Sequence, residues 1–248
     1  NYADFGLGTW QPKNGFFDLV NAMIKLGESL GVEFLTNSNV DSIEVTNKEV
    51  DAIVINGIKH DCSLIISGAD YAHTESLLNQ KYRQYSDKYW SKKTWSPSSL
   101  LFYVGFNKKV PNVAHHNLFF DTDFEKHAQD IYDNPKWTKD PLFYANFTSI
   151  TNPNTAPKDC ENGFFLIPIA TNLEDNEDIR NEYFDIIIER LEKLTGEKLR
   201  EHILFKKSFC INDFEKEYNS YGGNAYGLAN TLMQTAFLRP NLKSKKVK

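Results

Sequence analysis

The fold class is set first by residues 14–36, which read NGFFDLVNAMIKLGESLGVEFLT. Apolar residues recur at three- and four-residue spacing up to residue 30, and this spacing predicts an amphipathic helix. Asn14 is a suitable N-cap and Gly31 a suitable C-terminal stop. Residues 32–36 then predict a strand.

Two runs farther along alternate apolar and polar residues with a period of two, at residues 39–45 and 50–55. The intervening residues 46–49 have turn chemistry, so the two runs predict a β-hairpin. Asn56 and Gly57 turn the chain again, and residues 62–66 predict a buried strand. A helix followed by strands at this spacing predicts a mixed α/β (α+β) architecture.

The same patterns predict the remaining elements. The expected strands cover residues 98–106, 116–120, 142–148, 163–170 and 199–209. The expected helices cover residues 72–79, 86–93, 123–132, 177–194, 213–218 and 225–238. The clearest helix is 177–194, because Asp175 or Asn176 can cap it, acidic residues occupy its first turn and Gly196 ends it.

The bulk composition excludes several classes of protein. The chain has 248 residues, 41% of them apolar, and a net charge of −5, which gives no reason to expect a nucleic-acid partner. No apolar run approaches the roughly 20 residues of a membrane-spanning helix, and the first residues do not resemble a signal peptide. Three scattered cysteines predict no disulfide framework and fit a reduced, cytosolic setting.

Aromatic residues are the unusual feature of the composition, at 18 Phe, 12 Tyr and 4 Trp. Such side chains can line a long apolar cavity, because they bring a large apolar area with few rotatable bonds. They can equally form an aromatic-rich core, and composition leaves both interpretations open.

Motifs for metal binding, nucleophilic catalysis and phosphate binding do not stand out. His115 and His116 lack the spacing of a metal-ligand set, and no GxSxG motif is present. Gly6-Leu7-Gly8 lacks the third glycine and the preceding strand of a dinucleotide fingerprint. The residues alone therefore predict a soluble mixed α/β protein with no metal and no marked catalytic base.

Several stretches carry a resemblance to a known family. They are Gly8–Phe16 (GTWQPKNGF), Ile66–Tyr71 (ISGADY), His115–Asp121 (HHNLFFD), Ala156–Asn162 (APKDCEN) and Tyr218–Leu232 (YNSYGGNAYGLANTL), which continues to Arg239-Pro240. In this order they resemble the bacterial-type phytoene desaturases, which are FAD-dependent carotenoid desaturases of the amine-oxidase-like superfamily. The Tyr218–Leu232 stretch is the most specific of them.

The resemblance implies a domain organisation. Residues 1–80 would supply part of an FAD-binding domain, residues 81–210 a substrate-binding domain with a mixed sheet and a helical cap, and residues 211–248 a return toward the flavin domain. The family's N-terminal dinucleotide fold, with its GxGxxG turn, is not found in this sequence. The chain is therefore expected to be an internal fragment that is inactive alone.

The resemblance also implies a reaction. The family introduces double bonds into a C40 polyene such as phytoene, with hydride transfer to FAD. The protein mainly supplies an apolar tunnel and alignment, because the cofactor carries the difficult chemistry. This would explain why no polar catalytic triad is visible.

Site residues follow from the family's motifs. The residues expected at the cofactor are Val40, through its backbone on the adenine side, and Gly68, Ala69 and Asp70 at the edge of the flavin domain. The residues expected at the junction of flavin and substrate are Tyr221, Asn224 and Tyr226.

A carotenoid substrate is dissolved in lipid, so the resemblance implies peripheral contact with the inner face of the cell membrane from the cytoplasm. Residues 82–132 are the expected lid and membrane face. Two alternatives stay open: an amine or retinoid oxidoreductase of the same superfamily, and a non-catalytic domain that binds an apolar ligand.

Overall fold

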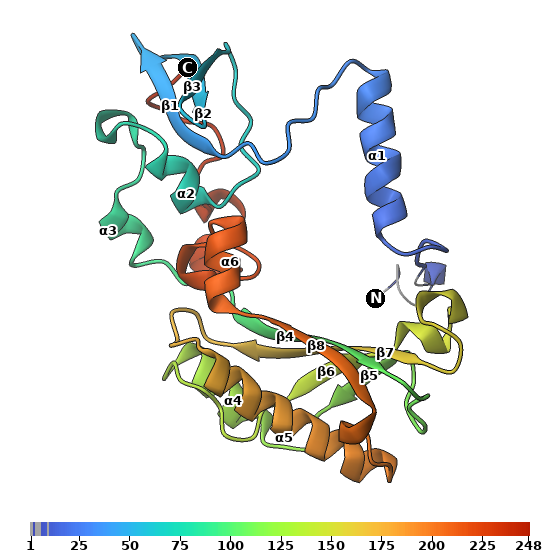
Figure 1. Cartoon of the computed structure of the whole chain (residues 1–248). Coiled ribbons are helices and arrows are strands. Elements are labelled where there is room, and N and C mark those ends of the chain that lie inside the picture. The colour runs from blue at the N-terminus through green and yellow to red at the C-terminus, as the bar shows by residue number, and fades with distance from the viewer. Residues whose placement is uncertain (1, 3–5, 9) are drawn as a thin grey trace.

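The structure is a computed structural model that describes residues 2, 6–8 and 10–248. Thr9, which belongs to the first quoted motif, lies outside the described residues. The chain forms two separate sheets, one of three strands and one of five. Figure 1 shows the small sheet at one end of the molecule and the large sheet at the other, with the segment from about residue 211 onward running back toward the small sheet.

The small sheet is built from two consecutive hairpins. Its strands are β1 (Val40–Thr46), β2 (Glu49–Ile55) and β3 (Ile58–Asp61), all antiparallel. Asn47 and Lys48 turn the first hairpin with positive φ angles of 52° and 69°. A two-residue turn of this geometry matches the right-handed twist of the strands. The predicted hairpin is confirmed.

Two predicted strands are wrong. Residues 32–36 and 62–66 form no strand in the described chain, although the Cys62 N–H donates to the Asp51 carbonyl of β2 (3.1 Å). A strand exists only through hydrogen bonds to a neighbour, so an apolar β-type sequence without a partner stays an exposed extended segment. Ile66, expected in a buried strand, is 89% exposed.

The predicted N-terminal helix is confirmed as α1 (Phe17–Ser29). It stands apart from both sheets in Figure 1 and has no buried residue. Its apolar side chains, Phe17, Leu19, Val20, Met23 and Leu26, are all exposed. The periodicity that predicts the helix is therefore not satisfied by packing within the described residues.

The large sheet has the strand order β5-β6-β7-β4-β8. Its strands are β4 (Ser98–Phe106), β5 (His116–Phe119), β6 (Phe143–Asn146), β7 (Glu161–Ile169) and β8 (Ile203–Phe209). Each was predicted within a few residues. Every strand pair is antiparallel, which corrects the expected mixed sheet within an otherwise confirmed mixed α/β class.

One face of the large sheet forms the main core. Leu100, Phe102, Val104 and Phe106 of β4 point into this core, because alternate residues of a strand share a face. In Figure 1, α4 (Phe124–Tyr132) and α5 (Glu177–Thr195) cover this face. The caps of α5 are those predicted.

The opposite face of the large sheet carries the intervening side chains. Leu101 and Tyr103 of β4 alternate with the core residues, and strand register places Tyr103 beside Phe164 of β7. The register continues the same face through Tyr144 of β6 to Leu118 of β5. This outer face of the sheet thus carries many apolar and aromatic side chains, with Lys207, Asn146 and His116 on the same face.

The remaining helices are short. They are α2 (Tyr71–Ser76), α3 (Asp87–Trp90) and α6 (Ile211–Tyr218), with 3-10 turns at Gln80–Tyr82, Thr148–Ile150, Pro153–Thr155, Arg200–His202, Tyr221–Gly223, Leu232–Gln234 and Ala236–Leu238. The helix predicted at residues 225–238 is wrong. The backbone N–H groups of Ala225 and Ala229 donate to Pro97 and Thr94 carbonyls (3.0 and 3.1 Å), so they are bound to another segment instead.

A buried histidine on α4 makes one prediction about pH. The Nδ1 atom of His127 accepts the N–H of Leu142 (3.0 Å), and its Nε2 lies 2.9 Å from the carbonyl of Pro168. The imidazole is therefore neutral, with its proton on Nε2. Burial lowers the pKa of His127, against the opposing effects of the Pro168 carbonyl and Asp130.

In the unfolded chain this histidine would take up a proton near pH 6.5. The unfolded state therefore binds more protons than the folded state below that pH, and the free energy of unfolding falls as the pH falls. Urea titrations of wild type and His127→Gln from pH 8 to pH 5 should show the stability advantage of wild type shrinking below about pH 6.5. A constant difference would contradict this assignment; His60→Gln, which removes an exposed imidazole, is the control.

Candidate functional site

A cavity of about 600 Å³ lies between the outer face of the large sheet and the segments that lead back to the small sheet. Its floor is formed by Leu101 and Tyr103 of β4 and Phe209 of β8. Residues 68–71 and 224–228 form two further walls, although they lie far apart in the sequence. The cavity therefore brings together three distant parts of the chain.

Five of the seven predicted site residues line this cavity: Gly68, Ala69, Asp70, Asn224 and Tyr226. Tyr221 lies next to it, because its backbone N–H donates to the Asp70 carboxylate (3.3 Å). Val40 is not among the lining residues; it begins β1, an edge strand of the small sheet. The predicted roles of these residues stay predictions.

Asp70 holds the two walls of the cavity together. Its Oδ1 accepts the N–H of Ala72 (2.9 Å) and thereby caps α2. Its Oδ2 accepts the side-chain amide of Asn224 (3.0 Å) and the backbone N–H of Tyr221. With three donors already bound, this carboxylate primarily positions the 221–227 loop.

Asn224 is the counterpart of Asp70 and is only 2% exposed. Its Nδ2 also donates to the Tyr221 carbonyl (3.0 Å), and its Oδ1 accepts the N–H of Gly227. The amide side chain thus fixes both ends of the loop. Tyr226 lies between these anchors, with its N–H on Ser96 Oγ (3.0 Å), and its ring is 71% exposed.

The glycine pair that precedes Asn224 is required by geometry. Gly222 and Gly223 have φ angles of 59° and 67°, in the left-handed region that favours glycine. A Cβ on Gly223 would lie 2.6 Å from Ile211 Cγ2 and 2.9 Å from the Ile211 backbone. The dense glycine motif therefore forms a tight turn packed against α6 rather than a flexible link.

Aromatic rings complete the cavity wall. Phe209 packs edge-on against Phe214 of α6, and both rings approach Tyr218. Burial raises the pKa of the Tyr103 phenol on the cavity floor, with a smaller contribution from Tyr218. Six of the sixteen residues that line the cavity are aromatic, and two, Asp70 and Arg239, are charged.

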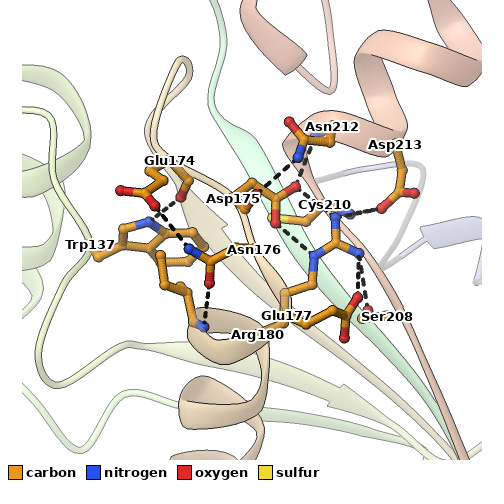
Figure 2. A network of polar contacts seen from close by, with 11 residues as sticks. Trp137, Glu174, Asp175, Asn176, Glu177, Arg180, Ser208, Cys210, Asn212 and Asp213 are labelled. Carbon is orange, nitrogen blue, oxygen red and sulfur yellow. Dashed lines mark hydrogen bonds and ion pairs between the residues drawn. The ribbon is translucent and has the colours of Figure 1, made fainter.

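A buried polar network beside this wall, shown in Figure 2, had no recognisable signal in the sequence. Arg180 of α5 binds Asp175 through two parallel hydrogen bonds (2.7 and 2.6 Å) and also contacts Asp213 (2.8 Å) and Ser208 (3.1 Å). Asp175 in turn accepts the N–H of Asn212 (2.9 Å). The network joins the start of α5 to the end of β8 and the start of α6.

The charges of this network reinforce one another. Hydrogen bonding to Asp175 raises the pKa of Arg180. Burial opposes ionisation of Asp175, but Arg180 and the Asn212 N–H outweigh it, and the pKa of Asp175 is lowered. Burial also raises the pKa of the neighbouring Cys210 thiol to about 12, so this cysteine is an unreactive core residue.

Comparison with known proteins identifies the family. The family model described as flavin containing amine oxidoreductase matches residues 1–248, and the chain belongs to this family. A flavin, expected as FAD, is the cofactor that this membership implies.

The curated relatives place the chain beside carotenoid enzymes. It is 39% identical over its whole length to a carotenoid 3,4-desaturase from Haloarcula japonica, of which it covers 50%. It is 29% identical to a 1-hydroxycarotenoid 3,4-desaturase from a Flavobacterium species and 28% to a lycopene-forming phytoene desaturase from Pantoea ananas, with 97% of this chain aligned in both and 49% and 50% of those proteins covered. The resemblance to carotenoid desaturases is confirmed, and the chain spans about half the length of these relatives.

Solved structures agree on the fold. The crystal structure of an oxidoreductase from Methanosarcina mazei superposes with a TM-score of 0.53 at 14% identity, over 79% of this chain and 42% of that protein. At this identity the similarity concerns the fold alone.

The cavity has room for a flat cofactor ring. A Cβ on Gly68 would meet no atom within 4 Å, so the backbone at Gly68 has an open side. The aromatic lining and the exposed backbone suit an extended aromatic ring system. The residues present therefore fit part of a flavin-binding surface.

Proposed function

We propose that the chain is the substrate-facing half of an FAD-dependent carotenoid desaturase, which introduces double bonds into a polyene by transferring hydride to flavin. The observation that carries this proposal is a row of apolar and aromatic side chains that crosses all five strands on the outer face of the large sheet and reaches the cavity at Leu101 and Phe209. Leu101 and Tyr103 belong to both surfaces.

The dimensions of this face suit a rod-shaped apolar molecule. Its five strands are separated by four spacings of about 4.8 Å, which gives a width of about 19 Å. Across this width the register aligns one row of apolar and aromatic side chains, Phe209, Leu101, Leu166, Tyr144 and Leu118. A polyene lying across the strands would thus meet aromatic and aliphatic side chains and lead into the cavity.

The cofactor would contact the wall opposite this face. The backbone of Gly68 and Ala69 would lie against it, and the backbone of Val40 on its adenine side. When bound, flavin supplies the acceptor for hydride. Asp70 and Asn224 hold the wall and the 221–227 loop in place. No residue of the chain is assigned as the base.

The division of labour along the chain is part of this proposal. Residues 1–80 would serve the flavin domain, residues 81–210 the substrate domain, and residues 211–248 the return to the flavin domain. Contacts between the first and last segments support it, since Asn224 binds Asp70 and the Lys248 N–H donates to the Lys48 carbonyl (2.7 Å).

A membrane surface is the proposed source of the substrate, approached from the cytoplasmic side as a peripheral contact. Within the described residues, none of the helices combines the length and apolar character needed to cross a bilayer. Leu118, Phe120 and Phe124 are exposed within the segment 82–132, which supports this segment as the contact. Exposed rings beside an open sheet face suit shallow insertion among lipids.

Anaerobic mixing tests the reaction class. The full-length protein that contains this chain, loaded with FAD, should lose its oxidised-flavin absorption when mixed with liposomes that carry phytoene or a later carotene. Unchanged flavin with every polyene, together with bleaching by an amine or a retinoid, would favour the alternative oxidoreductases of the same family.

Tyr226 gives a residue-level test. Its exposed ring at the cavity should contact cofactor or substrate, so Tyr226→Phe in the full-length protein should lower turnover roughly tenfold, the order of one lost hydrogen bond. Tyr2→Phe, at an exposed ring outside the cavity, is the control. Unchanged turnover would remove the Tyr226 hydroxyl from the site.

A further inference from the structure

Six tyrosine and tryptophan rings form one continuous cluster beside the cavity. Trp90 is its centre, with centroids 6.0 Å from Tyr71, 5.2 Å from Tyr85, 5.0 Å from Tyr89 and 6.1 Å from Trp95. The sixth ring, Tyr221, stacks on Trp95 at 4.5 Å and an interplanar angle of 14°. Each ring therefore touches the next.

The cluster differs in chemistry from the main core. Phenylalanine supplies most rings of the main core: Phe102, Phe106, Phe143, Phe147, Phe165 and Phe184. The small cluster around Trp90 contains no phenylalanine among its described members. Tyrosine and tryptophan are the side chains whose rings lose one electron most readily, whereas phenylalanine is inert to such oxidation. Redox-active rings are thus concentrated in the small cluster.

Trp90 is buried at the centre of the cluster without a partner for its indole N–H in the described part of the chain. The ring is 1% exposed, and its Nε1 atom has no hydrogen-bond partner among the described residues. A buried N–H without an acceptor costs about 1–3 kcal/mol, which a phenylalanine at the same place would avoid. The indole N–H, unpaired within the described chain, thus distinguishes Trp90 from the phenylalanine rings of the main core.

The cluster connects the cavity to the surface. Tyr71 lines the cavity directly after Asp70, and Tyr221 is bound to the Asp70 carboxylate through its backbone. At the other end, Tyr85 and Tyr89 stack at 4.4 Å and are half-buried. Trp90 is the only described ring that the measured pairs place between Tyr71 and these two tyrosines.

We propose that this cluster is a one-electron relay that carries oxidising equivalents from the cavity to the surface. The oxidant is a flavin excited by blue light, which takes one electron from the ring of Tyr71 or Tyr221. Trp90 then donates an electron to the oxidised tyrosine, directly or through Trp95. Tyr85 or Tyr89 in turn donates an electron to the oxidised Trp90. The flavin gains one electron, the outer tyrosine loses one, and its phenol proton passes to water.

The inference rests on the proposed function only in assigning the cavity to flavin, and it can be tested without any polyene on the full-length protein. Riboflavin in solution serves as the photo-oxidant under blue light, with a nitroso spin trap present. Peptide mass spectrometry then measures trap adducts at each tyrosine and tryptophan. The relay predicts adducts concentrated at Tyr85 and Tyr89, and a fall of at least fivefold at both in Trp90→Phe.

The same experiment contains its controls. In Trp90→Phe, adducts should rise at Tyr71 and Tyr221, because Trp90 is no longer present to reduce their radicals. Tyr183→Phe, in the main core, should change neither pattern. Adducts that follow solvent exposure alone, with no effect of Trp90→Phe on Tyr85 and Tyr89, would overturn the relay. Circular dichroism confirms folding, and Trp95→Phe provides a second substitution that leaves the direct Tyr71–Trp90 contact intact. Because no polyene is present, this outcome is independent of desaturase activity.

Discussion

Arg180→Met is expected to lower the free energy of unfolding by about 3–5 kcal/mol. Arg180 is 8% exposed, and the Asp175 side chain that it binds is fully buried. Removing the guanidinium leaves a buried carboxylate without its charge partner, and such a loss greatly exceeds the value of a surface ion pair. Urea denaturation followed by circular dichroism measures the change.

Arg200→Met is the matched control. Arg200 also pairs with an acidic partner, Asp185 of α5, but both of these side chains are about half exposed. Its effect should stay below about 1 kcal/mol. Equal losses in the two variants would contradict the assignment of the Arg180 network as the joint between α5, β8 and α6. Since α6 carries Phe214 and Tyr218, Arg180→Met should also disorder one wall of the cavity.

Asn224→Asp is expected to cost about 3 kcal/mol at pH 8 and much less at pH 5. The substitution places a carboxylate oxygen where an amide N–H now donates to Asp70 at 3.0 Å, in a site that is almost fully buried. Two like charges at this distance repel. At lower pH one carboxyl group takes up a proton, which restores a hydrogen bond between the two.

Asn230→Asp is the control for this prediction, because Asn230 is exposed and its side-chain oxygen accepts from Arg239 (3.0 Å). A carboxylate there should cause no loss at either pH. Stability measured by thermal denaturation at pH 8 and pH 5 separates the cases. A loss at Asn224 that does not depend on pH would show that the Asp70 contact is not the cause.

Local patterns predicted most of the regular structure. Period-two alternation found β1, β2 and β4, whose hydrogen-bond partners lie within the chain, and the capping residues of α5 were read correctly because caps act within one helical turn. The two wrong strands have a common cause. Residues 32–36 and 62–66 have strand-like sequences, but strand formation depends on a neighbour that a local pattern does not contain.

In the candidate site, too, some residues could be predicted from the sequence and others could not. The motif around Gly68–Asp70 and the Tyr218–Leu232 stretch led to residues that meet at one cavity, although about 150 residues separate them. The Arg180 network gave no signal, because Asp175 and Asp213 look like ordinary surface acids in sequence. Only the approach of β8 to α5 makes them partners of a buried arginine.

The central claim is that the outer sheet face and its cavity align a polyene for oxidation by flavin. The most direct measurement follows polyene absorption after the full-length, FAD-loaded protein is added to liposomes carrying phytoene, then lycopene-type and monocyclic carotenes. The account predicts a new band at longer wavelength with at least one of them, as conjugation extends. Protein that holds FAD yet produces no such band from any of these polyenes would contradict it.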